Sequence, residues 1–375
     1  MTGSIQLTLL IGPGMPVPAL ADVTNALDSV QITSSTDSSG FQLSFKIGKK
    51  SLLQTTLLPA GYFDPIITRV IIIVTVNGMP NVLMDGVVTR QELSPSNDVG
   101  KSTLTITGED LSRMMDLVEM PFKRFPAMPV VARVYEILAK YMVLGIAPIA
   151  IPPIVPDMAN PLKKIASQKG TDLSYIKELA YKCAYVFYIE PGPVPGSSIA
   201  YFGPDIRIPT PQPALNVNMD ALTNVESLSF SLDGTAKKIV VLTIQDPITE
   251  KLWIPIPLPN ISILRPPLGA RPTVPSKLEF AKGVGALMPD EAANFALRML
   301  LTANDSVTGS GSLDVLRYGR VLRSRMLVGV RGAGLAYDGL YYVNSVTHNI
   351  KHGEYKQNFN LSRDGLISNT PSVMP

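Results

Sequence analysis

The first hundred residues alternate apolar and polar positions with the period of two that is typical of β-strands. In FQLSFKIG every second position from Phe41 to Ile47 is apolar, and KSTLTITGED repeats the pattern further along. Between them, RVIIIVTV is joined to a second strand by Asn77-Gly78, a dipeptide that two-residue hairpins favour. We therefore expect residues 1–110 to form a first small β-barrel domain.

Helical spacing appears in the middle of the chain. The segment PVVARVYEILAKYMVLG, residues 129–145, has apolar residues at intervals of three and four. TDLSYIKELAYKC has a similar apolar stripe, and Thr171 can cap the start of that helix. AYVFYIE then returns to a strand pattern. These features predict an α/β insertion domain over residues 111–215.

The strand pattern returns near residue 216. VESLSFSLDGTAKKIVVLTIQD predicts a hairpin around Asp233-Gly234. RSRMLVGVRG, GLYYVNSVTHNIKHG and EYKQNFNLSRDG predict successive strands that are separated by glycine-rich turns. We assign residues 216–246 and 310–365 to a second β-barrel domain and residues 366–375 to a C-terminal tail. The two β units share a loose plan, which points to internal duplication.

Residues 247–309 form a different kind of insertion. WIPIPLP has proline at alternate positions, which excludes a central strand and favours an extended edge segment. Further on, residues 290–305 predict a helix, with Asp290 as its cap. No apolar run reaches the roughly 20 residues of a membrane-spanning helix.

The composition limits the classes of function. Charged residues make up 17% of the chain, below the usual share of about 25%. A surface poor in charge is often buried in an oligomer or larger assembly. The net charge of +3 is too small to indicate nucleic-acid binding by bulk electrostatics, so we expect no sequence-specific nucleic acid as partner. One cysteine fits a reducing compartment.

Both histidines, His348 and His352, lie in THNIKHGEYKQNF. A helix would bring residues four apart onto one face, where they could hold a metal, but the glutamate of the zincin motif is absent. The surrounding Tyr, Val and Thr predict a strand, on which the two would lie about 13 Å apart at ~3.3 Å per residue. We interpret both as polar positions flanking a hairpin, and expect no metal and no cofactor.

Other catalytic arrangements have little support. No GxSxG motif is present, and Cys183 at a helix end is expected to be a buried structural residue. The glycines of GVRGAGLAYDG are not followed by the lysine of a phosphate loop. The acidic pairs Glu109-Asp110 and Asp290-Glu291 lie after a strand and at a helix start, which gives no positional support for glycoside hydrolysis.

The segment RYGRVLRSRMLVGVRG is the basic cluster of the chain. One interpretation is a solvated face, or a set of partners for acidic residues of a neighbouring subunit. Another is a positive rim of a channel that passes DNA or protein, which the small net charge disfavours. The candidate interface residues are Arg317, Arg320, Arg323, Arg325 and Arg331 of this cluster, together with Trp253.

Four segments, in this order, resemble the baseplate hub proteins of contractile phage tails and related injection systems. They are LMDGVVTRQELSPSNDVGKSTLTITGEDLSRMMD, GTDLSYIKELAYKCAYVFYIEPG, VESLSFSLDG and YDGLYYVNSVTHNIKHGEYKQNFNLSRDG. That family includes phage late control protein D and the N-terminal part of valine-glycine repeat protein G. The chain departs from the family pattern at Ser174, Tyr175 and Ile176, which replace the usual aromatic positions.

The resemblance implies a mainly β chain with α/β insertions, in which two similar small β-barrels per chain assemble into a pseudo-sixfold trimeric ring. Such a homotrimer joins the sixfold tail tube to the threefold central spike. The implied partners are the spike, tube, tape measure and baseplate wedge proteins. The implied location is the tail baseplate of a virion or an injection particle, assembled in the bacterial cytoplasm, and the implied role is not enzymatic.

Two alternatives stay open. One is another all-β structural protein of a tail or capsid. The other is an enzyme, a peptidoglycan hydrolase carried on the tail. A hub forms a trimer without lytic activity, whereas a hydrolase clears cell-wall substrate. For a hub, we expect residues 290–365 to contribute to the intersubunit or tube contact.

Overall fold

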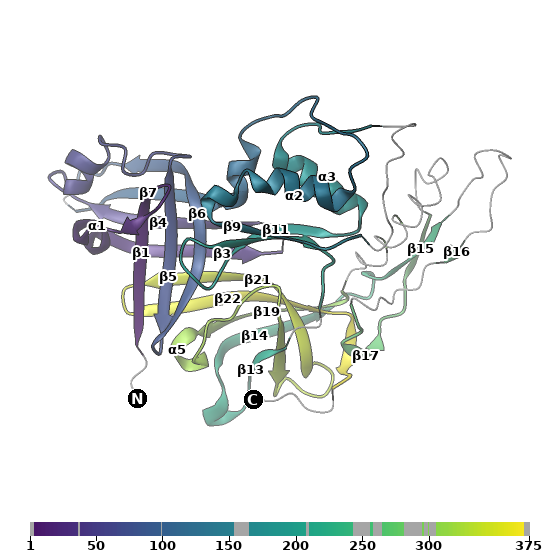
Figure 1. Cartoon of the computed structure of the whole chain (residues 1–375). Coiled ribbons are helices and arrows are strands. Elements are labelled where there is room, and N and C mark those ends of the chain that lie inside the picture. Colours follow the sequence, from purple (N-terminus) through teal and green to yellow (C-terminus); the bar gives the residue numbers. More distant parts are fainter. Residues whose placement is uncertain are drawn as a thin grey trace.

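The computed structural model of the chain is dominated by one 13-stranded sheet, against which an α/β segment packs (Figure 1). The predicted class, mainly β with an α/β insertion, is confirmed. The structure describes residues 4–36, 38–98, 100–153, 165–207, 210–242, 256–257, 265–280, 295, 299 and 305–370.

The first unit of the large sheet has the strand order β3-β4-β7-β6-β5-β1. Its predicted hairpin is confirmed, because Asn77 and Gly78 have φ of 51° and 81° and turn β5 into β6. The elements are β1 (Ile5–Pro13), β2 (Val17–Pro18), α1 (Ala21–Ala26), β3 (Leu27–Ser35), β4 (Ser39–Ile47), η1 (Leu53–Leu57), β5 (Thr68–Val76), β6 (Met79–Ser94) and β7 (Ser102–Asp110).

The second unit has the order β14-β19-β22-β21-β20-β13, and β21 also pairs with β3 of the first unit. The predicted hairpin that turns at Gly353 is confirmed as β21–β22. β13 precedes the expected start of the second domain at residue 216, yet pairs with β20. The elements are β13 (Gln212–Asn216), η4 (Asp220–Leu222), β14 (Val225–Leu232), β19 (Val307–Asp314), α5 (Val315–Tyr318), β20 (Leu327–Arg331), β21 (Gly339–Lys351) and β22 (Glu354–Arg363).

The two units therefore repeat one topology. When the two-residue β2 is left out and the other strands are numbered along the chain within each unit, both units have the spatial order 2-3-6-5-4-1. The units differ at the last pair, since β1 runs antiparallel to β5 whereas β13 runs parallel to β20. This shared strand order supports the internal duplication that the sequence indicated.

The predicted hairpin around Asp233-Gly234 is wrong. β14 pairs with β19, while β15 (Lys238–Leu242) pairs with β16 (Ile256–Pro257) and β18 (Lys277–Phe280) in a separate sheet. Neither turn residue adopts the positive φ that a tight two-residue hairpin needs. The Asp233 carboxylate instead accepts the Thr235 backbone N–H at 2.7 Å, which redirects the chain away from β14.

The α/β segment places α2 and α3 over a small sheet of order β11-β12-β9 (Figure 1). The predicted helices and the following strand are confirmed, and the Thr171 hydroxyl accepts the Ser174 N–H at the start of α3. Its elements are η2 (Leu111–Asp116), β8 (Arg124–Phe125), α2 (Val130–Ala139), η3 (Met142–Leu144), β9 (Ile146–Ala150), β10 (Ala166–Ser167), α3 (Asp172–Lys182), β11 (Val186–Pro191) and β12 (Ser198–Gly203).

The Pro-rich insertion is described only in part. Residues 265–280 contain β17 (Gly269–Pro272), which pairs with β23 (Gly365–Ser368), and β18. Trp253 and the predicted helix over 290–305, apart from three of its positions, lie outside the described residues. In the described part of the chain, no helix is long and apolar enough to cross a membrane.

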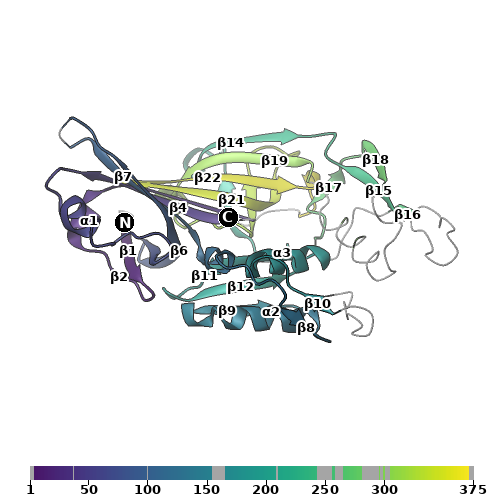
Figure 2. The same ribbon diagram turned by 90° about the horizontal axis from the view of Figure 1, so that it is seen from above.

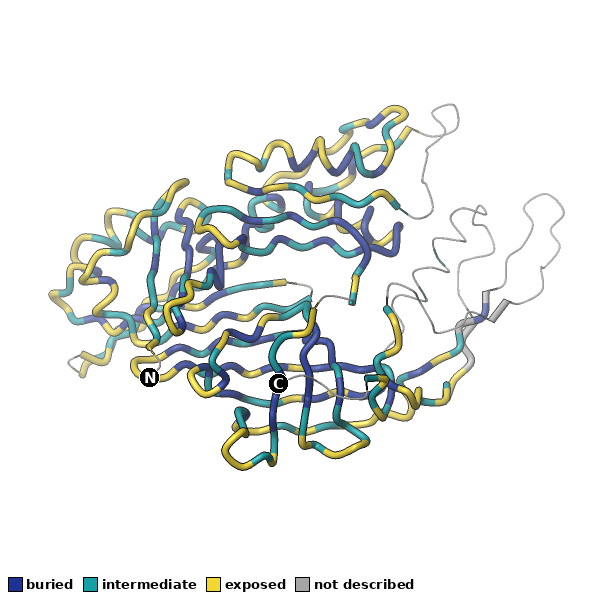
Figure 3. Tube along the Cα trace, turned by 60° about the horizontal axis from the view of Figure 1, so that its bottom comes forward, coloured by how far each residue is buried: buried dark blue, intermediate teal, exposed yellow. Residues whose placement is uncertain are grey.

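Two hydrophobic cores hold the fold together. One is continuous through both units and includes Leu43, Phe45, Tyr341 and Phe359. The second lies between the helices and the small sheet, where Phe125 stacks on a tyrosine of α3. Figure 3 shows buried positions concentrated along the strands and exposed ones at the turns. Since the units share one core, they are expected to fold as one body.

Candidate functional site

The predicted interface arginines differ in their exposure to solvent. Arg317, Arg320 and Arg323 are exposed, and Arg331 is half-buried at the end of β20. The side chain of Arg325 turns inward and is only 9% exposed. Trp253, the remaining candidate interface residue, lies outside the described residues.

Arg325 connects three parts of the chain. Its guanidinium lies 4.0 Å above the ring centre of Tyr188 in β11, and its Nη1 lies 4.0 Å from the Glu190 carboxylate. Its Nη2 donates a hydrogen bond to the carbonyl of Ser35 at the end of β3. Burial raises the pKa of Glu190, and the positive charges of Arg325 and Arg323 oppose that rise. Arg325 thus joins the second unit to the first unit and to the α/β segment.

A pocket of about 200 Å³ lies beside Arg325. Its walls come from β3, β4, β6, β7, β11, β21 and the loop before β20. Its polar lining residues are Ser34, Ser39, Asp110, Tyr188, Glu190, Arg323, Ser324, Arg325 and His348. The pocket therefore lies where the two units and the α/β segment meet.

Two residues that were considered as catalytic candidates, Asp110 and Cys183, have roles in the fold. Asp110 accepts the backbone N–H groups of Ser39 and Ser112, at 3.2 and 2.8 Å, and so caps η2 and ties it to β4. The expectation that Cys183 is buried is confirmed, and it lies at the C-terminal end of α3. Both side chains have positions that stabilise the fold.

The histidines lie where a strand and its turn place them. His352 is exposed in the turn between β21 and β22, as expected of a polar position. His348 instead faces the core, where its Nδ1 lies 2.7 Å from the Tyr355 hydroxyl. Burial, together with the positive charge of Arg323, lowers the pKa of His348 to about 3. Among the described residues, no group of three metal-ligating side chains comes together.

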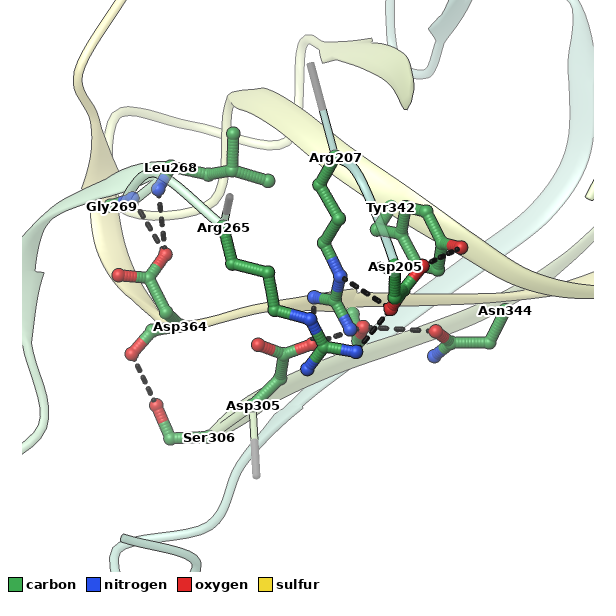
Figure 4. Close-up of polar contacts among 11 residues, drawn as sticks. Asp205, Arg207, Arg265, Leu268, Gly269, Asp305, Ser306, Tyr342, Asn344 and Asp364 are labelled. Carbon is green, nitrogen blue, oxygen red and sulfur yellow. Dashed lines mark hydrogen bonds and ion pairs between the residues drawn. The ribbon is translucent and has the colours of Figure 1, made fainter. Parts of the chain in front are cut away.

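A cluster of arginines and aspartates that the sequence did not predict lies on the second unit (Figure 4). Arg207 donates to Asp305 at 2.6 Å and lies 3.7 Å from Asp205, which is also bound by Arg265. The Tyr342 hydroxyl donates to Asp205 at 3.0 Å, and the Arg207 guanidinium lies 4.2 Å above the Tyr342 ring. Burial lowers the pKa of Arg207, but the two carboxylates outweigh burial and raise it.

A second group of contacts extends this cluster. The Asp364 carboxylate accepts the backbone N–H groups of Leu268 and Gly269, at 2.8 and 3.0 Å (Figure 4). The Asp364 carbonyl accepts the Ser306 hydroxyl at 2.9 Å. These bonds fix the segment around residue 265, the start of β19 and the end of β22 to one another. The cluster is an anchor for the Pro-rich insertion, built from residues that are far apart in sequence.

Comparison with known proteins shows which folds share this arrangement. No known protein-family model and no curated protein sequence match the chain. Among solved structures, a tail protein from Neisseria meningitidis has a TM-score of 0.62 at 14% identity, covering 98% of this chain and 99% of that one. A 43 kDa tail protein of prophage MuSo2 from Shewanella oneidensis has a TM-score of 0.60 at 15% identity, covering 97% and 100%.

A third similar structure comes from a secretion system. It is an E. coli component of the type VI secretion system that is described as structurally similar to the T4 bacteriophage tail proteins gp27 and gp5. It has a TM-score of 0.53 at 10% identity, and the alignment covers 93% of this chain and 77% of that one. The chain therefore has, over nearly its whole length, the fold of these phage tail and type VI secretion proteins.

Proposed function

We propose that the chain is the structural baseplate hub of a contractile tail or injection machine. The observation that carries this proposal is the end-to-end likeness to whole tail proteins, with 98% of this chain and 99% of the Neisseria protein aligned. An accidental likeness of a few strands would not extend through both units and the insertion. The likeness to a type VI secretion component points to the same class of machine.

The repeated units support a ring as the working form. Each unit would close into a barrel-like lobe, and three copies would supply six lobes around a channel. Such a homotrimer presents six similar surfaces to a sixfold tail tube while keeping threefold symmetry for a central spike. Tape measure and baseplate wedge proteins would be further partners, in a virion tail or an injection particle assembled in the bacterial cytoplasm.

The proposed role is mechanical and not enzymatic. Asp110 and Cys183 are engaged in the fold, as described above. Arg325 and the Asp205–Arg207–Asp305 cluster also act within the chain, as ties between its parts. The exposed Arg317, Arg320 and Arg323 remain available as interface residues in this proposal.

Two measurements on the purified full chain test the proposal. Light scattering should give a mass of about three times the 40.4 kDa of one chain. A turbidity assay with isolated peptidoglycan should show no clearing above a buffer control. A monomer that clears peptidoglycan would replace the hub with the hydrolase alternative. A non-lytic monomer would favour a different all-β tail or capsid component.

A further inference from the structure

The two units agree in register as well as in strand order. In β6, the pairing with β7 skips Thr89, between Val88 and Arg90. In β21, the pairing with β22 skips Asn344, between Val343 and Ser345. Such bulges mark fixed positions in a sheet. Arg90 of the first unit therefore corresponds to Ser345 of the second.

The strands β3 and β14 correspond in the same way. In β3 the pairing with β4 skips Asp28, and in β14 the pairing with β19 skips Glu226. Ser29 therefore corresponds to Ser227, and Thr33 to Ser231. The neighbouring strands agree with this alignment, because the pair Phe41–Gly108 in the first unit falls on the pair Gly309–Leu361 in the second.

The two units are joined within the chain by one pair of edge strands, here called a junction. The second half of β21, Ser345–Lys351, pairs with β3 over Ser29–Ser35. By the alignment above, the counterpart of this junction would pair the second half of β6 with β14. In the described chain, β14 pairs only with β19, and β6 beyond Val88 pairs only with β7. Among the described residues, both counterpart edges are thus without a partner strand.

The two open edges carry few of the features that usually block pairing: the β14–β19 and β6–β7 pairings each have one bulge, and the charged residues at the end of β6, Arg90 and Glu92, pair with each other. β14 carries one charged residue, Glu226, and no proline, and its serines alternate with apolar residues. Figure 2 shows β14 at the outer edge of the second unit. On β6, the end of the strand is exposed, including Leu93 at 44%. An unpaired edge with few charges, such as that of β14, is a template for strand addition.

We propose that β14 of one copy pairs antiparallel with the second half of β6 of the next copy, in the register of the β3–β21 junction. Transferring that register residue by residue places Arg90 opposite Asp233, Glu92 opposite Ser231, and Leu93 opposite Phe230. At the first pair, Asp233 would add a second carboxylate to the ion pair that Arg90 makes with Glu92, and at the third pair two apolar side chains meet. This complementarity was not used to set the register, so it supports the choice of a second copy as partner.

The junction is heterologous, since the surface that each copy offers differs from the surface that it meets. Such contacts close into a ring when the rotation between copies allows it. This inference rests on the proposed hub function and names the surface through which the three copies would associate. Each copy would then repeat between chains the contact that it already makes within itself.

A disulfide test reads the register directly. Within the chain, the hydroxyl oxygens of Thr33 and Thr347 lie 3.4 Å apart across the β3–β21 junction. Their counterparts across the proposed junction are Ser231 and Glu92, both exposed. The variant Glu92→Cys/Ser231→Cys should therefore form disulfides between copies under mild oxidation. Non-reducing gel electrophoresis should show a covalent trimer that disappears on reduction.

Four controls define the result. Thr33→Cys/Thr347→Cys should form the equivalent bond inside one chain and leave the mass on a denaturing gel at one chain. Each single variant, Glu92→Cys or Ser231→Cys, should form no covalent species, because a heterologous junction needs both residues. The pair Glu92→Cys/Leu232→Cys should cross-link at least tenfold less, because Leu232 points to the opposite face of the strand.

The outcomes separate this inference from the proposed function. A trimer by light scattering without a Glu92→Cys/Ser231→Cys cross-link would overturn the proposed junction and leave the hub function in place. Cross-linking of a single variant would show a symmetric contact and would also overturn it, as would a covalent ladder beyond the trimer. A wild-type monomer would contradict the hub function itself.

Discussion

At the scale of single residues, the two units place glycine and a large side chain on opposite strands of one equivalent strand pair. Phe41 in β4 lies against Gly108 in β7, where an added Cβ would come within 2.2 Å of the phenyl ring. At the equivalent pair of the second unit, the glycine is Gly309 in β19 and the large residue is Leu361 in β22. Each repeat thus places a glycine opposite one large side chain at this strand pair, and the two repeats differ in which strand supplies the glycine.

Gly311 in β19 is therefore expected to tolerate no side chain. An added Cβ would lie 2.3 Å from the Ser227 carbonyl oxygen and 2.7 Å from the Phe359 ring. Gly311→Val should lower the free energy of unfolding by about 1–3 kcal/mol, the usual cost of overpacking a core. Urea unfolding measures this. Gly234→Val, at a glycine with open space around it, is the matched control, and an equal loss in both variants would contradict the packing argument.

His348 should make stability depend on pH. Its folded-state pKa of about 3 lies below the ordinary 6.5, so below pH 6.5 the unfolded chain binds a proton that the folded chain does not. The free energy of unfolding should fall as pH drops from 7 to 5, by about 2 kcal/mol at pH 5.

The histidine responsible can be identified by substitution. His348→Gln should remove this part of the pH dependence, whereas His352→Gln at the exposed turn should keep it. Urea unfolding of both variants at pH 5, 6 and 7 measures the difference. Equal slopes with pH in wild type and His348→Gln would show that the buried imidazole does not contribute.

At the scale of elements, the start of α3 depends on one hydroxyl. Thr171 accepts the Ser174 N–H at 3.2 Å and donates to the Asp116 carboxylate at 2.6 Å, which ties α3 to η2. Thr171→Ala should cost about 1 kcal/mol of stability, the usual loss for a helix cap. Thr171→Ser should recover most of it. Thermal unfolding checks this, and a Thr171→Ala variant as stable as wild type would rule out the cap.

Elements with strong local signals could be predicted from the sequence. The turns at Asn77-Gly78 and Gly353 and the capped helix after Thr171 each depend on residues close together in the chain. The prediction of a hairpin at Asp233-Gly234 was wrong, because the partner of β14 is β19, which follows some 75 residues later. Local turn chemistry gave no information about that distant partner.

The functional residues were less predictable for the same reason. An arginine-rich stretch indicates charge, but only the fold shows that Arg325 turns inward against Tyr188 and Glu190 while Arg323 stays exposed. The Asp205–Arg207–Asp305 cluster joins residues separated by about a hundred positions, and no spacing rule finds it. The sequence held one usable signal for His348. It lies two residues from both Val346 and Ile350, and residues two apart on a strand share a face, so His348 belonged on the same buried face as these apolar residues.

At the scale of the whole molecule, the charge pair of the proposed junction offers a reversible test. Arg90→Asp would place two carboxylates opposite each other, and should shift the concentration for half-assembly upward about tenfold, equal to about 1.4 kcal/mol. Asp233→Arg should weaken assembly at least as much, because it places two cations opposite each other and also removes the hydrogen bonds from Thr235. The double variant Arg90→Asp/Asp233→Arg should restore assembly, as measured by sedimentation. Two independent losses without restoration would exclude this pairing.

The central claim is that three copies, each with two repeated units, form one six-lobed ring. Electron microscopy of the purified full chain tests it most directly, because end-on class averages display the number and symmetry of the lobes. The account predicts a closed ring with six lobes that differ alternately, giving threefold symmetry around a central channel. Isolated two-lobed particles, or a ring with any other number of lobes, would contradict it.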